Sequence, residues 1–229
     1  MTKQNDGIAI FLANRHYLYG LLQHIFGHEP SIELIEVIVS EHTKKALKLL
    51  LDEDEHKLND CLAVLEELKQ AISTGADDTL DKLKSEYTYL MLGPNKLPAP
   101  PWESVYLTDE RMIFQENTLR VRRTYLEYQF LPANYPHEAD DHIALELDFL
   151  THLAKLTQEA FEEENIEEVK RLLSDQKAFL EEHLLVWIGD FAEQIQLSKT
   201  HHLYPQMASL TEQVLKIDAA ALDELISLL

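Results

Sequence analysis

The chain has a single cysteine and no apolar run of the length that spans a bilayer, and each shortage excludes a class of protein. Cys61 cannot form an intrachain disulfide by itself, and its isolation disfavours a zinc site built on thiolates. A transmembrane helix needs about 20 predominantly apolar residues in a row. The N-terminus, "MTKQNDGIAIFLANRHYLYG", also lacks the basic start and long apolar core of a secretory signal. We therefore expect a cytoplasmic protein that does not insert into membranes.

Basic residues are scarce as well. The sequence has 20 lysines and arginines against 41 aspartates and glutamates, a formal net charge of −21. Nucleic-acid binding depends on lysine and arginine contacts to phosphates, so this balance argues against a nucleic-acid partner. A negative field of this size attracts cationic partners, such as an arginine-rich peptide, and it also serves solubility.

Alternating apolar and polar residues with hairpin turns, the signature of β-strands, occur nowhere in the sequence. Apolar residues instead recur every three or four positions, which predicts amphipathic helices. The sequence predicts an all-α fold, a single globular domain of about ten helices over residues 1–229. The breaks near 93–108 and 130–136 could divide it into two packed helical halves. The expected helices cover 6–26, 31–50, 53–72, 77–92, 117–129, 137–161, 165–183, 184–197, 201–216 and 218–229.

Prolines are concentrated at the centre of the chain. Four of the eight lie between Pro94 and Pro101, in the stretch "GPNKLPAPPWESVYL" (93–107). Proline fixes φ and cannot continue a helix, so this stretch predicts a stiff connecting loop.

The segment "HEADDHIALELDFLTHLAKL" (137–156) places acids among apolar residues. If it is helical throughout, Glu138, His142 and Glu146 are four residues apart and form one stripe inside an apolar arc. Burying an unpaired charge is costly, so these side chains should have a partner. The partner could be another side chain of the fold, a metal or a cationic ligand.

Several catalytic patterns can be tested against the sequence. The Glu-x-x-His pattern of ferritin-like di-iron sites occurs only at Glu53 and His56. Nucleophile elbows and P-loops are absent. His137 with Asp141, and Glu138 with His142, have a spacing that could hold one metal, which leaves a metal-dependent helical hydrolase as an alternative. A helical adaptor for another basic peptide is a second alternative.

Two stretches carry a family resemblance: "EYTYLMLGPNKLPAPPWESVY" (86–106) and "PHEADDH" (136–142). Together they resemble the two signature motifs of the TorD/DmsD family of cytoplasmic chaperones for molybdenum-containing oxidoreductases. Asn95 stands where a glycine is common in this family, and Ala139 replaces a frequent proline. The resemblance implies a TorD-like all-helical fold over the whole chain.

The resemblance also implies a function. Family members bind the twin-arginine signal peptide of a client reductase and hold the client back from export until its molybdopterin cofactor is inserted. No catalytic residue, metal or cofactor of the chaperone itself is expected. The partner would be the signal peptide together with the apo form of the oxidoreductase. Some members form domain-swapped dimers, so a monomer or a dimer exchanged about residues 130–136 is expected.

The residues implied in peptide binding lie in the two motifs. They are Trp102, Glu103, Glu138, Asp141 and His142. Trp102 should therefore lie close to Asp141 and His142 if the motifs make one site.

The chemistry of the residues is consistent with this role. A twin-arginine peptide carries two guanidinium groups and then an apolar stretch, and guanidinium groups pair with carboxylates in bidentate geometry. Glu138, Asp141 and Glu146 are candidate acceptors, and Trp102 and Tyr106 are candidate walls of an aromatic groove.

Overall fold

The computed structural model describes residues 3–51, 55–94, 96–108, 110–132, 137–200 and 202–229. Within these ranges the chain is helical and contains no strand, which confirms the all-α prediction. The α-helices are α1 (Lys3–Gly27), α2 (Ile32–Ile38), α3 (Glu41–Leu51), α4 (Glu55–Tyr87), α5 (Glu103–Leu107), α6 (Glu116–Glu127), α7 (Ile143–Glu162), α8 (Ile166–Glu182), α9 (Ile188–Leu197) and α10 (Tyr204–Leu228). A π-helical turn η1 (Thr88–Leu92) comes directly after α4, and a 3₁₀ turn η2 (Leu184–Val186) precedes α9.

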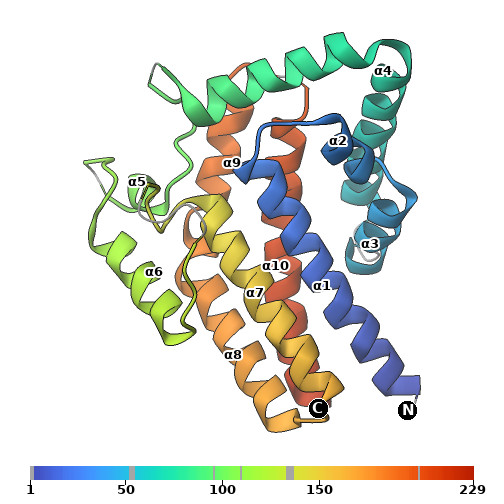
Figure 1. Ribbon diagram of the computed structural model, residues 1–229, viewed down its shortest axis with the longest axis vertical. Coiled ribbons are helices and arrows are strands. Elements are labelled where there is room, and N and C mark those ends of the chain that lie inside the picture. Colours follow the sequence, from blue (N-terminus) through green and yellow to red (C-terminus); the bar gives the residue numbers. More distant parts are fainter. Residues whose placement is uncertain (1–2, 52–54, 95, 109, 133–136, 201) are drawn as a thin grey trace.

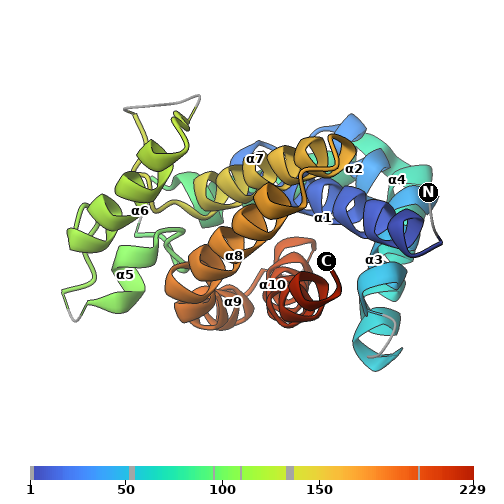
Figure 2. The ribbon, with the colours of Figure 1, turned by 90° about the horizontal axis from the view of Figure 1, so that it is seen from below.

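Five helices, α1, α7, α8, α9 and α10, form the centre of the molecule. α1 packs along α7, α7 along α8, and α10 lies against both α8 and α9 (Figures 1 and 2). α2, α3 and the first part of α4 flank this bundle on one side, whereas α5 and α6 flank the other (Figure 1). None of the helices within the described ranges has the length and apolar content needed to cross a membrane.

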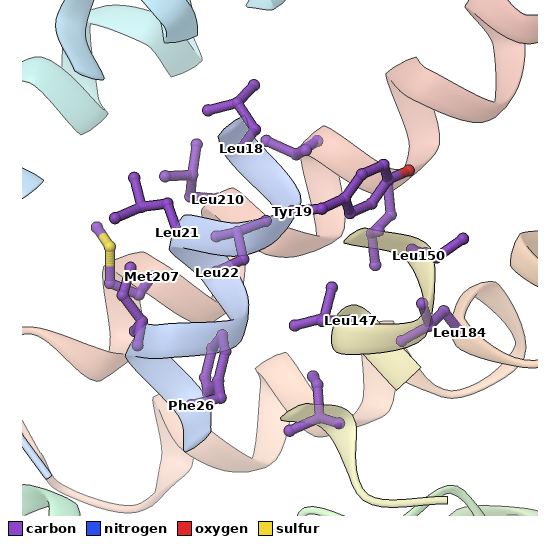
Figure 3. Packing of buried hydrophobic residues seen from close by; sticks show 14 of the residues in the cluster. Leu18, Tyr19, Leu21, Leu22, Phe26, Leu147, Leu150, Leu184, Met207 and Leu210 are labelled. Carbon is purple, nitrogen blue, oxygen red and sulfur yellow. The ribbon is translucent and has the colours of Figure 1, made fainter. Parts of the chain in front are cut away.

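The buried apolar side chains form one cluster that extends from Ile8 to Leu225. Figure 3 shows the part of it where α1, α7 and α10 meet, with Leu22 and Phe26 of α1 near Leu147 of α7 and Met207 of α10. A single cluster of this extent lets helices far apart in the sequence stabilise one another, because each covers the apolar stripe of its neighbours.

Some helix boundaries differ from the predicted ones. The stretch 31–50 forms two helices, because the Ser40 hydroxyl accepts a hydrogen bond from the Thr43 N–H (3.2 Å) and starts α3 there. The stretches 53–72 and 77–92 are joined in α4, with a kink at Gly75 (φ −171°, ψ 73°). The stretches 201–216 and 218–229 form the continuous α10, and α5 has no counterpart among the predicted helices.

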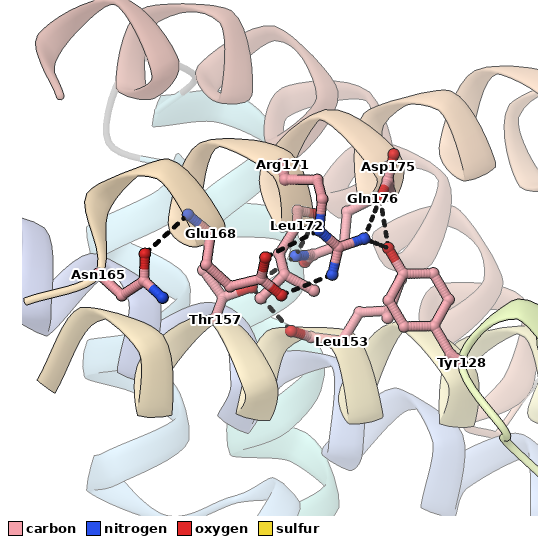
Figure 4. A network of polar contacts seen from close by, with 9 residues as sticks. All are labelled: Tyr128, Leu153, Thr157, Asn165, Glu168, Arg171, Leu172, Asp175 and Gln176. Atoms are coloured by element: carbon pink, nitrogen blue, oxygen red, sulfur yellow. Dashed lines mark hydrogen bonds and ion pairs between the residues drawn. The ribbon is translucent and has the colours of Figure 1, made fainter. Parts of the chain in front are cut away.

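Polar contacts fasten the outer helix α6 to the bundle. Tyr128, at the C-terminal end of α6, donates a hydrogen bond to Asp175 of α8 (Figure 4). The Arg171 guanidinium donates to Tyr128 Oη and Asp175 Oδ2, each at 3.0 Å, and to Glu168. Beneath them, Gln176 donates to the buried Thr157 hydroxyl of α7 (2.8 Å). α6 therefore has a fixed position relative to α7 and α8.

One buried ion pair crosses the core between α1 and α10. Arg15 Nε lies 2.6 Å from Asp218 Oδ1 and Arg15 Nη2 lies 2.9 Å from Asp218 Oδ2, with both side chains buried. The Tyr19 hydroxyl donates to the same carboxylate. This bidentate arrangement satisfies the carboxylate without water and ties the first helix to the last.

Asp218→Asn should reduce the free energy of unfolding by about 3–5 kcal/mol, because it leaves the buried Arg15 cation without its counter-ion. Urea denaturation followed by circular dichroism measures this loss. Asp78→Asn is the matched control, since Asp78 pairs with Lys82 on the exposed surface of α4 and such pairs contribute little. If Asp218→Asn loses as little stability as the control, the Arg15–Asp218 ion pair does not have the stabilising role given to it here.

Candidate functional site

The two motifs meet through their backbones. Trp102 and His142 form an isolated antiparallel bridge. The Glu103 N–H donates to the Asp141 carbonyl (3.0 Å), and the Ile143 N–H donates to the Pro101 carbonyl (2.9 Å). The expected proximity of Trp102 to Asp141 and His142 is therefore confirmed, although these segments are far apart along the chain.

Trp102 is half-buried, and the second motif holds its indole from two directions. Indole Nε1 donates to Glu138 Oε1 at 2.8 Å, and the ring packs edge-on against the His142 ring with 5.7 Å between centroids. Glu138 Oε1 also accepts from the Ala139 N–H (3.0 Å). No group in the described part of the chain bonds to Glu138 Oε2. The half-buried Glu138 thus presents one free carboxylate oxygen beside the Trp102 ring.

His142 begins α7 instead of lying within it. Its backbone is extended (φ −74°, ψ 136°), and its Nδ1 accepts a hydrogen bond from the Ala144 N–H (3.1 Å) as the helix cap. Burial lowers the pKa of His142, which keeps the ring neutral and leaves Nδ1 free to accept.

The expected stripe of Glu138, His142 and Glu146 is wrong for this reason. α7 starts at Ile143 and not at residue 137, so only Glu146 lies on the helix. The backbone pairing of His142 with Trp102 uses an extended conformation that a helix cannot supply. Glu138 is consequently placed by the turn before α7 and points to Trp102.

The other acids of the two motifs are inside the protein. Glu103 is 1% exposed, and Asp141 and Glu146 are 0% exposed. Asp141 Oδ2 accepts from the Ser104 N–H (2.9 Å) and so holds the first turn of α5. Glu103 Oε2 lies 3.0 Å from His183 Nδ1, and Glu146 Oε2 accepts from Trp187 Nε1 at 3.3 Å. These acids have partners within the fold, so neither Asp141 nor Glu146 presents a surface carboxylate.

Glu146 and Glu103 lie in the same interior, and both are buried. Burial raises the pKa of Glu146 well above its usual range, and the neighbouring Glu103 carboxylate raises it further. Both effects favour the neutral form of the Glu146 carboxyl. A neutral Glu146 avoids placing two negative charges side by side in the interior.

Two partners of the site carried no sequence signal. Arg122 of α6 lies 2.5 Å from Asp140 Oδ2 and ties that helix to the second motif. His183, at the end of α8, faces Glu103. Both contacts join residues that no local spacing rule connects, so the sequence pattern could not indicate them.

Tyr106 lies one turn beyond Trp102, at the far end of α5. Its ring packs against Trp187, the residue before α9, and against Phe191 of α9, with centroid distances of 5.4 and 6.3 Å. Burial raises the pKa of Tyr106, so its hydroxyl stays protonated. Tyr106 is half-buried and reaches a different part of the surface from Trp102.

The metal alternative can be compared with this geometry. Among the residues that the structure describes, no three histidine, cysteine, aspartate or glutamate side chains are arranged to hold a metal ion. His137, Glu138, Asp141 and His142 are described, so the arrangement does not favour the hydrolase.

Comparison with known proteins places this geometry in a family. The model of the nitrate reductase delta subunit family matches residues 54–193. The probable Tat proofreading chaperone DmsD of Haemophilus influenzae is 34% identical over 134 residues, 58% of this chain and 59% of that protein. The chaperone protein TorD of Vibrio cholerae is 28% identical over 218 residues, which cover 95% of this chain and 96% of TorD.

The fold and the paired motifs thus define an all-helical protein of the nitrate reductase delta subunit type. Within that class, the chain belongs to the TorD/DmsD family of chaperones. The alignment spans about three fifths of the DmsD relative and nearly the full length of the TorD relatives.

The raised pKa of Glu146 predicts a pH dependence. A carboxyl whose pKa is raised by folding stabilises the native state below its ordinary value near 4.5, and this stabilisation is lost as the pH rises through the folded pKa. Glu146→Gln is neutral at every pH and therefore removes this loss. Its stability relative to the unmodified protein should therefore rise with pH, by at most about 1.4 kcal/mol per pH unit.

Urea denaturation between pH 5 and 8 measures the difference. Glu162→Gln at the exposed end of α7 is the control and should show a difference that does not change with pH. A constant difference for Glu146→Gln as well would show that Glu146 is ionised in the folded protein.

Proposed function

We propose that the chain is a cytoplasmic chaperone that binds the twin-arginine signal peptide of a molybdopterin-dependent oxidoreductase. In this role it would assist cofactor insertion and folding of the apo-enzyme and delay its export. The observation that carries the proposal is the Trp102–Glu138 pair, a half-buried indole bonded to a carboxylate that keeps one oxygen free. The names of the relatives, a Tat proofreading chaperone and TorD chaperones, support the same role.

The pair suits a guanidinium with apolar side chains next to it. Trp102 Nε1 fixes the orientation of the Glu138 carboxylate through Oε1, which leaves Oε2 to accept from a guest arginine. The indole face is the strongest aromatic partner for a cation, and its apolar area can receive the neighbouring apolar residues of the guest. A net charge of −21 increases the rate of encounter with a basic peptide.

The buried acids have a supporting role in this proposal. Asp141 accepts a hydrogen bond from the Ser104 N–H in the first turn of α5. Glu103 of α5 contacts His183, and Glu146 of α7 accepts from Trp187. They act as positioning residues, because none of these carboxylates is exposed to a guest. Trp102, Glu138 and the edge of His142 would make the direct contacts at this end of α5.

The chaperone is proposed to act without catalysis and without a cofactor of its own. Chaperone names among the relatives support a non-catalytic protein. A monomer and a dimer exchanged about residues 130–136 are both compatible with the proposal, and residues 133–136 of this hinge lie outside the described ranges.

Glu138→Gln should weaken binding of a synthetic peptide with two adjacent arginines and an apolar stretch by about tenfold. The variant keeps the Oε1 acceptor for Trp102 but loses the charge that pairs with a guanidinium, a contact worth roughly 1.5–3 kcal/mol. Isothermal titration calorimetry measures the affinity. The same peptide with both arginines replaced by lysine should bind more weakly and respond less to Glu138→Gln, since a planar guanidinium can stack on the indole while it donates to Oε2, whereas an ammonium is more strongly hydrated.

Glu127→Gln on the exposed face of α6 is the matched control for the change in net charge. Unaltered binding by Glu138→Gln would mean that the site is misplaced. If the unmodified protein binds the arginine peptide and the lysine peptide no more tightly than an uncharged peptide, the chain is an adaptor for some other segment.

A further inference from the structure

A second candidate contact lies at the other end of α5. Residues of α5, of the loop after it and of α9 surround a pocket of about 290 Å³. We call it the Tyr106 pocket; the residues that matter here are Tyr106, Arg111, Asp190, Glu193 and Gln194.

The protein places a guanidinium of its own in this pocket. Arg111 Cζ lies 5.8 Å from the centroid of the Tyr106 ring, within the range of a cation–π contact. Arg111 has φ 50°, in the left-handed region that residues other than glycine seldom adopt. The chain thus accepts an unfavourable backbone conformation at the residue whose side chain covers the ring.

Arg111 leaves the acids of the pocket unpaired. Asp190 and Glu193 are three residues apart on α9, so they lie side by side on its surface, and both are exposed. Neither makes an ion pair with any residue in the described part of the chain, and Arg111 makes none either. The Tyr106 hydroxyl, shielded from solvent, also has no hydrogen-bond partner there. An aromatic face, two carboxylates and an unused phenol are the groups that would bind a guanidinium more completely than Arg111 does.

The surface beside the pocket suits the apolar part of a signal peptide. Leu107, Met112, Ile113 and Phe114 are all exposed, and Phe114 reaches 67%. Three of them lie on the same loop as Arg111, and Leu107 ends the helix before it. An arginine in the pocket would therefore bring the next apolar residues of its peptide onto an apolar surface.

We propose that the Tyr106 pocket is a guanidinium subsite for one arginine of the guest peptide, and that Arg111 is an internal competitor which the guest displaces. This inference rests on the proposed function: one arginine of the same peptide would bind beside Trp102 and the other in the Tyr106 pocket. Competition has a defined consequence. The apparent affinity is reduced by the fraction of molecules in which Arg111 covers Tyr106, so removal of Arg111 tightens binding.

The test uses two variants with opposite expected effects on the twin-arginine peptide. Asp190→Asn combined with Glu193→Gln should weaken binding at least about fivefold, because two carboxylate partners of the guanidinium are lost. Arg111→Ala should tighten binding about two- to tenfold, because the competitor is gone. Calorimetry with the full-length chain measures both, and circular dichroism checks that each variant keeps its fold.

Matched controls separate the pocket from the overall charge. Glu162→Gln combined with Glu167→Gln removes two exposed carboxylates at the distant α7–α8 turn, and Lys48→Ala removes one exposed cation from α3. Both should change the affinity less than about twofold, since exposed charges far from the pocket are screened by salt.

Equal effects of the pocket variants and their controls would overturn the subsite while the proposed function stands. If the unmodified protein does not bind the twin-arginine peptide, the proposed function falls and the subsite with it. A peptide with a single arginine gives a further distinction. Its affinity should depend on only one of the two places: either Glu138→Gln or the combined Asp190 and Glu193 changes should leave it unaltered. One guanidinium cannot occupy both places.

Discussion

The pairing of residues 101–103 with residues 141–143 is the constraint on which the rest of this structure depends. Two backbone hydrogen bonds across it decide where α5 and α7 begin, and they place Trp102 against His142. His142 then caps α7, because its Nδ1 accepts a hydrogen bond from the Ala144 N–H. Only a neutral imidazole has a ring nitrogen that can accept. The prolines before Trp102 limit the conformations of the loop in advance, so holding it in this pairing costs less entropy.

Acidic residues serve two purposes in this chain, and burial separates them. Glu103, Asp141 and Glu146 are inside, and each has one partner in the fold: the His183 ring for Glu103, the Ser104 N–H for Asp141 and the Trp187 ring N–H for Glu146. A carboxylate treated in this way stiffens the elements that it joins, since moving it would expose an unpaired polar group to an apolar interior. Glu138 remains at the surface on this rigid support. A preorganised acceptor of this kind loses little entropy when a guest arrives.

Local physical rules predicted most of the helices from the sequence. Leucines at three- and four-residue spacing indicated them, and their apolar faces are buried as expected. The same rules failed at residues 137–142, where helical spacing of Glu138 and Glu146 suggested one stripe but a distant segment imposed an extended backbone. The partners of Arg15 and Glu103 are 203 and 80 residues away, and only packing brings them together. The family motifs predicted that Trp102 and Asp141 lie close, yet not which acids are buried.

The short helix α5, which no pattern indicated, determines the spacing of the two candidate contacts. Trp102 stands at its start and Tyr106 near its end, so one turn of helix separates them by about 6 Å along the axis. Adjacent residues of an extended peptide have Cα atoms about 3.8 Å apart, and their side chains point to opposite sides. Under the proposed recognition, one arginine pairs with Glu138 beside Trp102 and its neighbour with the acids beside Tyr106, whereas a peptide with a single arginine fills one of these places. Recognition of a pair, in preference to any isolated basic residue, would then result from the length of one helical turn.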